Sequence, residues 1–274
     1  DLHRRRHSFP TRRSSDLRRS VGVAVPSPVD LAREQTLLGA VRRMLHVDDS
    51  ARIAFYQSVL AQPGPPVFEM QGADDRRLLA MLHSALWGSR HTFETYDEAF
   101  AALWAERAVL DELRELLPIL DRMSSTLTKG APVAGGVPLL VHARYSRDEV
   151  LAALDLSSAS KPASLREGAK HVPAHNADIF FVTLHKTEKA YSPTTMYKDY
   201  AISRDLFHWE SQATMSPGTP TISRYEDHAE NNHKVLLFVR DRKSEGGVTL
   251  PYLFAGPMNY VSSTGARPVA FTWR

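Results

Sequence analysis

The sequence contains no cysteine, and this absence removes several kinds of site at once. Disulfide bonds, thiolate zinc sites and a cysteine nucleophile are all excluded. A chain without cysteine is compatible with a reducing compartment, and we expect a cytoplasmic protein. No apolar run reaches the roughly 18 residues that a membrane-spanning helix requires, so we expect no membrane partner.

The familiar catalytic sequence motifs are also missing. There is no phosphate-binding loop that ends in Gly-Lys-Ser/Thr, no Gly-x-Ser-x-Gly elbow and no His-Glu-x-x-His. The polar stretch 225–234 offers Asp227, His228, Glu230 and His233, but their spacing matches no metal-binding pattern. A solvated loop before a strand explains this stretch equally well. We therefore expect no catalytic residue, no metal and no cofactor in this chain.

The positive net charge of +3 comes from the opening segment. Residues 1–20 hold seven Arg and two Asp without apolar periodicity, so we expect them to be disordered. This segment resembles a translated sequencing-adapter read-through, and it is set apart from the fold. The remaining chain has 27 basic and 29 acidic residues, so the isoelectric point near 9.1 does not indicate a strongly basic surface.

Residues 21–127 have the pattern of a helical connector domain. Leu37, Leu38 and Val41 recur at the three- and four-residue steps of a helix face. Asp49 or Ser50 is expected to cap one helix, and Gly88 is expected to end another. The stretch 95–123 predicts one long helix capped by Thr95. Because residues 21–140 carry 11 basic and 15 acidic residues, this bundle is a poor direct DNA binder and is expected to serve packing or coupling.

Residues 128–140 are rich in Gly, Pro and hydroxyl side chains and predict a linker. The domain that follows, 141–274, begins with a capping box formed by Ser146 and Glu149. Short segments rich in β-branched and aromatic residues then predict strands at 178–186, 234–242, 251–256 and 268–274. Together they favour a small β-barrel or a twisted sheet. The expected fold class is α+β, with an N-terminal helical bundle before a small, mostly-β domain.

Four large aromatic side chains lie in 192–212, a segment without a sustained period. A protein that reads a base stacks it on aromatic rings and hydrogen-bonds its edge, and a carboxylate can accept from the exocyclic amine of cytosine. The base-recognition candidates are Tyr197, Asp199, Tyr200, Trp209 and Glu210. The phosphate-contact candidates are Thr194, Thr195, Lys198, Ser203 and Arg204.

The same residues also have plainer interpretations. Most aromatic residues of a β domain lie in its core. Phe207 and Trp209 are two positions apart, so on a strand they share a face, which we expect to point inward. Asp199 can equally cap a short helix. His208 and Glu210 could form an acid–base pair, but on a strand they merely share the other face.

Several long phrases resemble one family, among them VHARYSRDEVLAAL, SPTTMYKDYAISRDLFHWESQ, KVLLFVRDR and YLFAGPMNYVSSTGARPVAFTW. They are similar to the C-terminal domain of unknown function of superfamily-two helicase proteins, over about 137–274. The resemblance implies an SRA- or PUA-like fold, a reader of methylated DNA, and upstream helicase and phospholipase D-type nuclease domains in a longer parent chain. Residues 30–127 resemble the connecting region of such proteins. Glu210 departs from the expected Gln, which would weaken a phosphate contact but still accept from a base edge.

Three functions are therefore expected to compete. The first is a DNA target-recognition module for double-stranded DNA, with methylated cytosine as the candidate target, in a bacterial restriction or defence protein. The second is a non-catalytic interaction module that couples a helicase to another protein without reading bases. The third is an autonomous hydrolase that uses His208, Glu210, Asp227 or His233.

Overall fold

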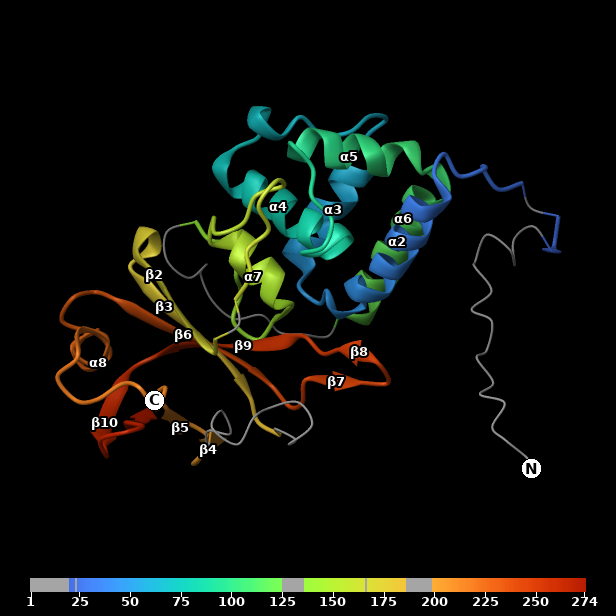
Figure 1. Cartoon of the computed structure of the whole chain (residues 1–274). Helices are drawn as coiled ribbons and strands as arrows, with labels where there is room; N and C mark the ends of the chain where they lie inside the picture. Colours follow the sequence, from blue (N-terminus) through green and yellow to red (C-terminus); the bar gives the residue numbers. More distant parts are fainter. Residues whose placement is uncertain (1–19, 23, 125–135, 166, 186–198) are drawn as a thin grey trace, which may run out of the picture.

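The structure is a computed structural model that describes residues 20–22, 24–124, 136–165, 167–185 and 199–274. Its first half is helical, and its second half holds the strands (Figure 1). The helical half contains α2 (Leu31–Arg43), η1 (Met44–His46), α3 (Ser50–Leu60), η2 (Phe68–Met70), α4 (Ala73–Trp87), α5 (Tyr96–Ala105) and α6 (Arg107–Met123). None of the described helices is both long and apolar enough to cross a membrane.

Local capping signals set most of the helix ends. The Asp49 side chain accepts a hydrogen bond from Arg52 N and caps α3, and the Thr95 hydroxyl accepts from Glu98 N and caps α5. α4 ends at Gly88, whose φ of 65° suits a residue without a Cβ. The predicted caps and the predicted stop are thus confirmed.

The prediction of one long helix over 95–123 is wrong, because the chain breaks at Glu106 between α5 and α6. Glu106 is buried, and its carboxylate accepts hydrogen bonds from the backbone N–H groups of Val29 and Asp30, at 3.1 Å and 2.9 Å. The bend therefore places a carboxylate where it satisfies backbone donors ahead of α2.

The second half is built on two larger sheets and a short ribbon. The five-stranded sheet has the order β1-β9-β6-β3-β2, the four-stranded sheet has the order β10-β11-β5-β4, and β7 pairs with β8. The strands are β1 (Arg144–Tyr145), β2 (Ala169–Val172), β3 (Ala177–Thr183), β4 (Tyr200–Ala201), β5 (Phe207–Glu210), β6 (Lys234–Arg240), β7 (Ser244–Glu245), β8 (Val248–Thr249), β9 (Tyr252–Met258), β10 (Tyr260–Thr264) and β11 (Ala270–Trp273). The helical elements among them are α7 (Arg147–Ala153), η3 (Pro173–His175) and α8 (Pro220–Glu226).

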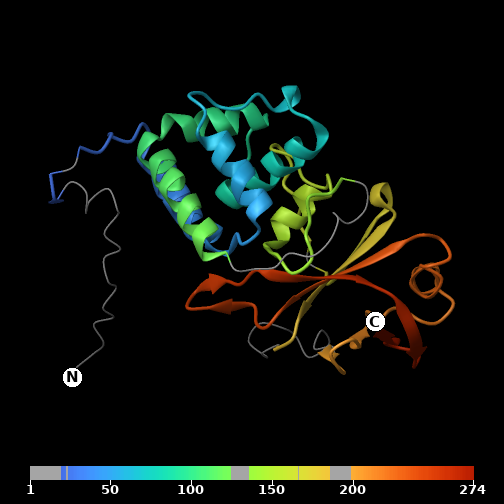
Figure 2. The ribbon, with the colours of Figure 1, turned by 180° about the vertical axis from the view of Figure 1, so that it is seen from behind.

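These strands do not close into a barrel within the described residues, so the predicted SRA- or PUA-like barrel is corrected to stacked layers. Every residue of β3 is buried, and β6 is nearly so. A strand that is buried on both faces needs a layer on each side, whereas strands of a closed barrel alternate between interior and exterior. Figures 1 and 2 show helices α2 to α7 on one side of the five-stranded sheet and β4, β5, β10 and α8 on the other. The α+β class is confirmed.

Three apolar cores hold these layers together. One lies within the helical half, the second lies between helices and the five-stranded sheet, and the third lies between the two sheets. Helix α4 contributes to the first two, because Leu79 and Leu82 face the helical core while Ala80 and Met81 pack on the other side. The two halves of the chain therefore share a core through α4.

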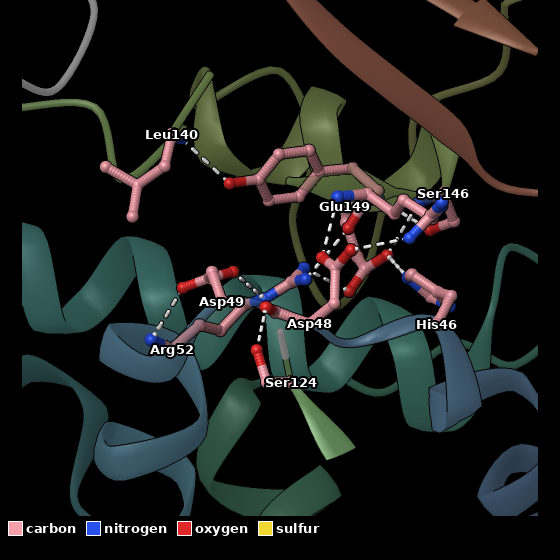
Figure 3. Close-up of polar contacts among 10 residues, drawn as sticks. His46, Asp48, Asp49, Arg52, Ser124, Leu140, Ser146 and Glu149 are labelled. Atoms are coloured by element: carbon pink, nitrogen blue, oxygen red, sulfur yellow. Dashed lines mark hydrogen bonds and ion pairs between the residues drawn. The ribbon is translucent and has the colours of Figure 1, made fainter. Parts of the chain in front are cut away.

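A buried polar network also crosses between the halves (Figure 3). Glu149 of α7 is fully buried; its carboxylate accepts from Arg52 Nη1 at 3.0 Å and lies 2.6 Å from His46 Nε2. It also accepts from Ser146 N, which completes the predicted capping box of α7. Burial alone would raise the pKa of Glu149, but the charges of His46 and Arg52 and these hydrogen bonds outweigh it and hold the pKa at about 2.

His83 gives the helical half a predictable pH dependence. Its ring is buried on α4, edge-on to Tyr96 at 5.1 Å, and burial lowers the pKa of His83 to about 4. Below pH 6.5, the pKa of histidine in the unfolded chain, His83 binds a proton in the unfolded chain but stays neutral in the folded chain. The neutral His83 ring therefore costs the fold nothing above pH 6.5. We expect the free energy of unfolding to fall by roughly 2–3 kcal/mol as the pH approaches 4.

Urea unfolding of the full chain at pH values between 6.5 and 4 measures this slope, which His83→Leu should reduce. His185→Leu is the matched control, because His185 is exposed and hydrogen-bonds Asp241. Equal slopes for the wild type and His83→Leu would show that His83 does not contribute.

Candidate functional site on the four-stranded sheet

The segment with the most recognition candidates contains the strands β4 and β5. Their antiparallel register pairs Tyr200 with His208, and β5 pairs on its other side with β11. Directly paired residues of antiparallel strands point to the same face of a sheet. Because Trp209 and Phe271 are a buried pair, Tyr200, His208 and Thr272 lie on the opposite face, which we call the outer face.

An aromatic stack stands on this outer face. The rings of Tyr200 and His208 lie 4.6 Å apart between centroids and are nearly parallel, at 10°. Tyr200 is 49% exposed although it is one of the larger side chains of the domain. One face of its ring is thus occupied by His208, and the residue retains exposed surface that a further flat group could cover.

The two carboxylate candidates occupy different positions. Asp199 Oδ1 accepts a hydrogen bond from Glu210 N at 3.2 Å, so Asp199 joins the start of β4 to the end of β5. Glu210 itself pairs in register with Ala270 and lies on the outer face, two positions from His208. Glu210 is therefore the candidate carboxylate that shares a face with the ring stack, and Asp199 positions the strand that carries Tyr200.

The turn between β4 and β5 presents Ser203 and Arg204. Both residues are exposed. The turn is fixed by Leu206 O, which accepts from the backbone N–H groups of Ile202 and Ser203, and by Ser203 Oγ, which accepts from Asp205 N. Arg204 therefore projects from a defined turn at the edge of the four-stranded sheet.

Trp209 requires a correction. Its ring is only 6% exposed and stacks on Phe180 of the other sheet at 4.1 Å, with Tyr225 edge-on at 5.8 Å. It fills the core between the two sheets and offers no ring face to a ligand. The alternation of side chains along β5 already favoured an inward position for Trp209. Phe207 points to the same side and packs, partly buried, against the same core.

The remaining candidates, Tyr197, Thr194, Thr195 and Lys198, lie outside the described residues. Sequence reasoning missed the outer-face hydroxyl groups on neighbouring strands. Ser262 pairs with Thr272, and Thr272 pairs with His208, so these groups form a row across the sheet. The alternation of polar and apolar residues in AFTW and YVSST indicates that the hydroxyl groups share one face of each strand. The sequence does not reveal which strands are neighbours, so the row across the sheet could not be predicted.

The residues considered for a hydrolase are divided between two places. His208 and Glu210 lie on the outer face of the four-stranded sheet, whereas His233 hydrogen-bonds Asp178 in the five-stranded sheet. His228 is buried, and its ring nitrogens contact His233 O and Tyr260 N at 3.1 Å and 3.0 Å. His228 therefore has a structural role. Among the described residues, one group could hold a metal, namely His171, Asp178 and His233.

Comparison with known proteins identifies one match within the chain. Residues 139–272 match a family model described as a domain of unknown function (DUF3427). The matched region runs from just before β1 into β11, so it contains both sheets and the outer face. No curated protein matches the chain.

Proposed function

We propose that the β half is a DNA target-recognition module that binds a nucleobase on the outer face of the four-stranded sheet. The observation that carries this proposal is the half-exposed ring of Tyr200, held flat against His208. A ring that is already fixed loses little conformational freedom when a base stacks on it. Stacking of one base on an aromatic side chain contributes about 1–3 kcal/mol.

The neighbouring groups suit the rest of a nucleotide. Glu210 can accept a hydrogen bond from the exocyclic amine of cytosine, which acidic side chains recognise on a base edge. The hydroxyl groups of Ser262 and Thr272 and the guanidinium of Arg204 can contact phosphate and sugar, and such contacts position a protein without reading sequence. A base stacked here would have left its duplex, because a paired base does not expose its face.

This proposal extends to the parent protein. The resemblance of 137–274 to helicase-associated domains supports a larger protein in which a motor and a nuclease act upstream and this domain selects the target. Sequencing the gene and its neighbourhood tests this step directly. An in-frame helicase upstream is the expected result, and a gene without one would contradict it while leaving base recognition open.

The second function, a coupling module that reads no bases, is favoured by the buried network of Glu149 and Arg52. This network and the shared helix α4 make the helical half a rigid support for the strands. A pulldown with a cognate motor domain, without measurable DNA affinity at low salt, would favour this alternative.

Fluorescence anisotropy with labelled duplexes tests base recognition. The full chain should bind a duplex with methylated cytosine more tightly than the unmethylated one. We expect Tyr200→Ala to weaken that binding by about 5- to 150-fold, which corresponds to the loss of one stacking contact of about 1–3 kcal/mol. Tyr200→Phe keeps the ring and should retain most of the affinity.

Leu253→Ala is the matched control, because Leu253 is an exposed apolar residue on β9 of the other sheet. It should leave the affinity unchanged. Equal, weak binding to both duplexes that persists in Tyr200→Ala would contradict base recognition at this site.

A further inference from the structure

Three potential metal ligands converge at one end of the five-stranded sheet. His171 on β2 is paired in register with Asp178 on β3, and His233 immediately precedes β6, the parallel neighbour of β3. One ligand atom from each of the three lies within 4.8 Å of the others. Asp178 and His233 are buried, and His171 is 37% exposed in its side chain. The group therefore lies just beneath the surface, with His171 on the solvent side.

Asn176 determines which nitrogen of His233 carries a proton. The Asn176 Nδ2 group donates to the carbonyl oxygens of Asn231 and Asn232, both at 3.1 Å. The reverse orientation of the amide would place its oxygen against these two carbonyls, so Oδ1 must be the atom 3.0 Å from His233 Nδ1. His233 Nδ1 therefore donates to Asn176, as the non-ligating nitrogen of a metal-bound histidine does.

This assignment leaves His233 Nε2 facing a carboxylate oxygen. The distance from His233 Nε2 to Asp178 Oδ2 is 2.7 Å. A neutral ring with its proton on Nδ1 has a lone pair on Nε2, which the carboxylate would repel. The contact thus needs either a proton between the two atoms or a metal ion that both atoms bind.

His171 supplies an independent observation. Its Nδ1 atom is buried and makes no hydrogen bond with the described residues, while Asp178 Oδ2 lies 3.4 Å away. A buried ring nitrogen without a partner loses the hydrogen bond that water would give it. His171 Nδ1 and His233 Nε2 both approach Asp178 Oδ2, and a cation bound by all three atoms would explain this arrangement.

We propose that His171, Asp178 and His233 bind one divalent transition-metal ion, with Zn²⁺ as the ion that suits two imidazole nitrogens and one carboxylate oxygen. Zn²⁺ binds histidine nitrogen and carboxylate oxygen at about 2.0–2.2 Å. Three protein ligands leave a fourth position for water. The exposed side of His171 provides the route by which the ion enters. The site lies on the other sheet from Tyr200 and does not depend on DNA binding.

Arg224 is the competing cation of this site. Its Nε and Nη2 atoms donate to the two oxygens of Asp178 at 2.7 Å and 3.2 Å. A carboxylate has about four lone pairs, so Asp178 can keep Arg224 while Oδ2 binds an ion. The guanidinium charge repels a metal ion, however, and it sets the affinity below that of a site without it. Arg224→Gln is therefore expected to bind Zn²⁺ more tightly than the wild type.

A bound ion would join two consecutive strands to the start of a third strand that lies much later in the sequence. β2, β3 and the start of β6 would share one coordination sphere beside α8, which carries Arg224. Because an ion that binds only the folded chain stabilises it, Zn²⁺ should raise the Tm of the protein. The role inferred for the ion is therefore to fix this end of the five-stranded sheet.

Isothermal titration of the chelator-treated full chain with Zn²⁺ alone tests the site. We expect binding to saturate at one ion per chain, and Co²⁺ in its place should show the visible absorption of a tetrahedral ion. His171→Ala should weaken binding by at least about 10-fold. This variant removes a partly exposed side chain and is expected to fold, which circular dichroism verifies.

His185→Ala is the matched control, because His185 is an exposed histidine that also contacts an aspartate, Asp241. It should bind Zn²⁺ as the wild type does. The proposal is overturned if the wild type fails to bind one ion, if His171→Ala binds as tightly as the wild type, or if His185→Ala removes the binding. A rise in Tm with Zn²⁺ in the wild type and a smaller rise in His171→Ala would support it.

Discussion

Glu149→Ala should lower the free energy of unfolding by about 3–5 kcal/mol, the cost of removing one partner from a buried ion pair. Arg52 is 1% exposed, and it would lose the Glu149 carboxylate 3.0 Å away while it keeps the ion pair with Asp49 at 2.8 Å. His46 would lose its 2.6 Å contact at the same time. Because these partners belong to the helical half and Glu149 to the β half, the loss should weaken the packing between them. Urea unfolding of the full chain at neutral pH measures the change.

The exposed pair of Glu69 and Arg76 provides the control for this prediction. Glu69 is 78% exposed in its side chain, so Glu69→Ala should change stability by less than about 1 kcal/mol. The low pKa of Glu149 adds a pH test. Its contribution is complete above the unfolded value of 4.5 and is lost as the pH falls toward about 2. A wild type whose acid unfolding matches that of Glu149→Gln would contradict this account.

Trp209→Ala should cost about 3–5 kcal/mol of stability, the usual effect of truncating a large core aromatic residue. The ring lies between the two sheets against Phe180, and its removal would leave a cavity in the third core. This result separates a core residue from a base reader. If Trp209 read a base, the variant would lose DNA affinity and keep its stability.

His208→Ala is the comparison that makes the Trp209 test specific. His208 is adjacent on β5 but points to the outer face, where its ring supports Tyr200. We expect it to change stability by roughly 1 kcal/mol or less, as at partly exposed positions in general, and to reduce DNA binding. In thermal unfolding Trp209→Ala should therefore show the larger loss of stability, whereas in DNA-binding anisotropy His208→Ala should show the specific loss of affinity.

Features set by neighbouring residues were predictable from the sequence. The caps at Asp49, Thr95 and Ser146 each depend on a side chain and a backbone group three residues away, and all three are confirmed. The inward position of Trp209 followed from strand alternation alone. Within such short distances, the sequence contains nearly all the information that decides the structure.

Features set by distant residues were not predictable. The helix break at Glu106 depends on backbone donors about 76 residues earlier in the chain. Helical periodicity reports only neighbouring residues and cannot indicate these donors. The barrel prediction was wrong because strand content does not reveal that β3 must be covered on both faces. The grouping of His233 with His171 and Asp178 was not predicted for the same reason, since strand pairing alone brings the three residues together. Base recognition and metal binding stay predictions.

The position of β11 has a consequence for biosynthesis. This strand lies between β10 and β5, and its Trp273 is fully buried. A ribosome releases the chain from its amino end, so β5 emerges some sixty residues before the partner that covers its inner edge. The nascent domain can assemble β3, β6 and β9 earlier, but the surface that carries Tyr200 must wait for 270–273 to leave the exit tunnel. Any base that the proposed site binds can therefore be bound only after residues 270–273 have been synthesised and have paired with β5.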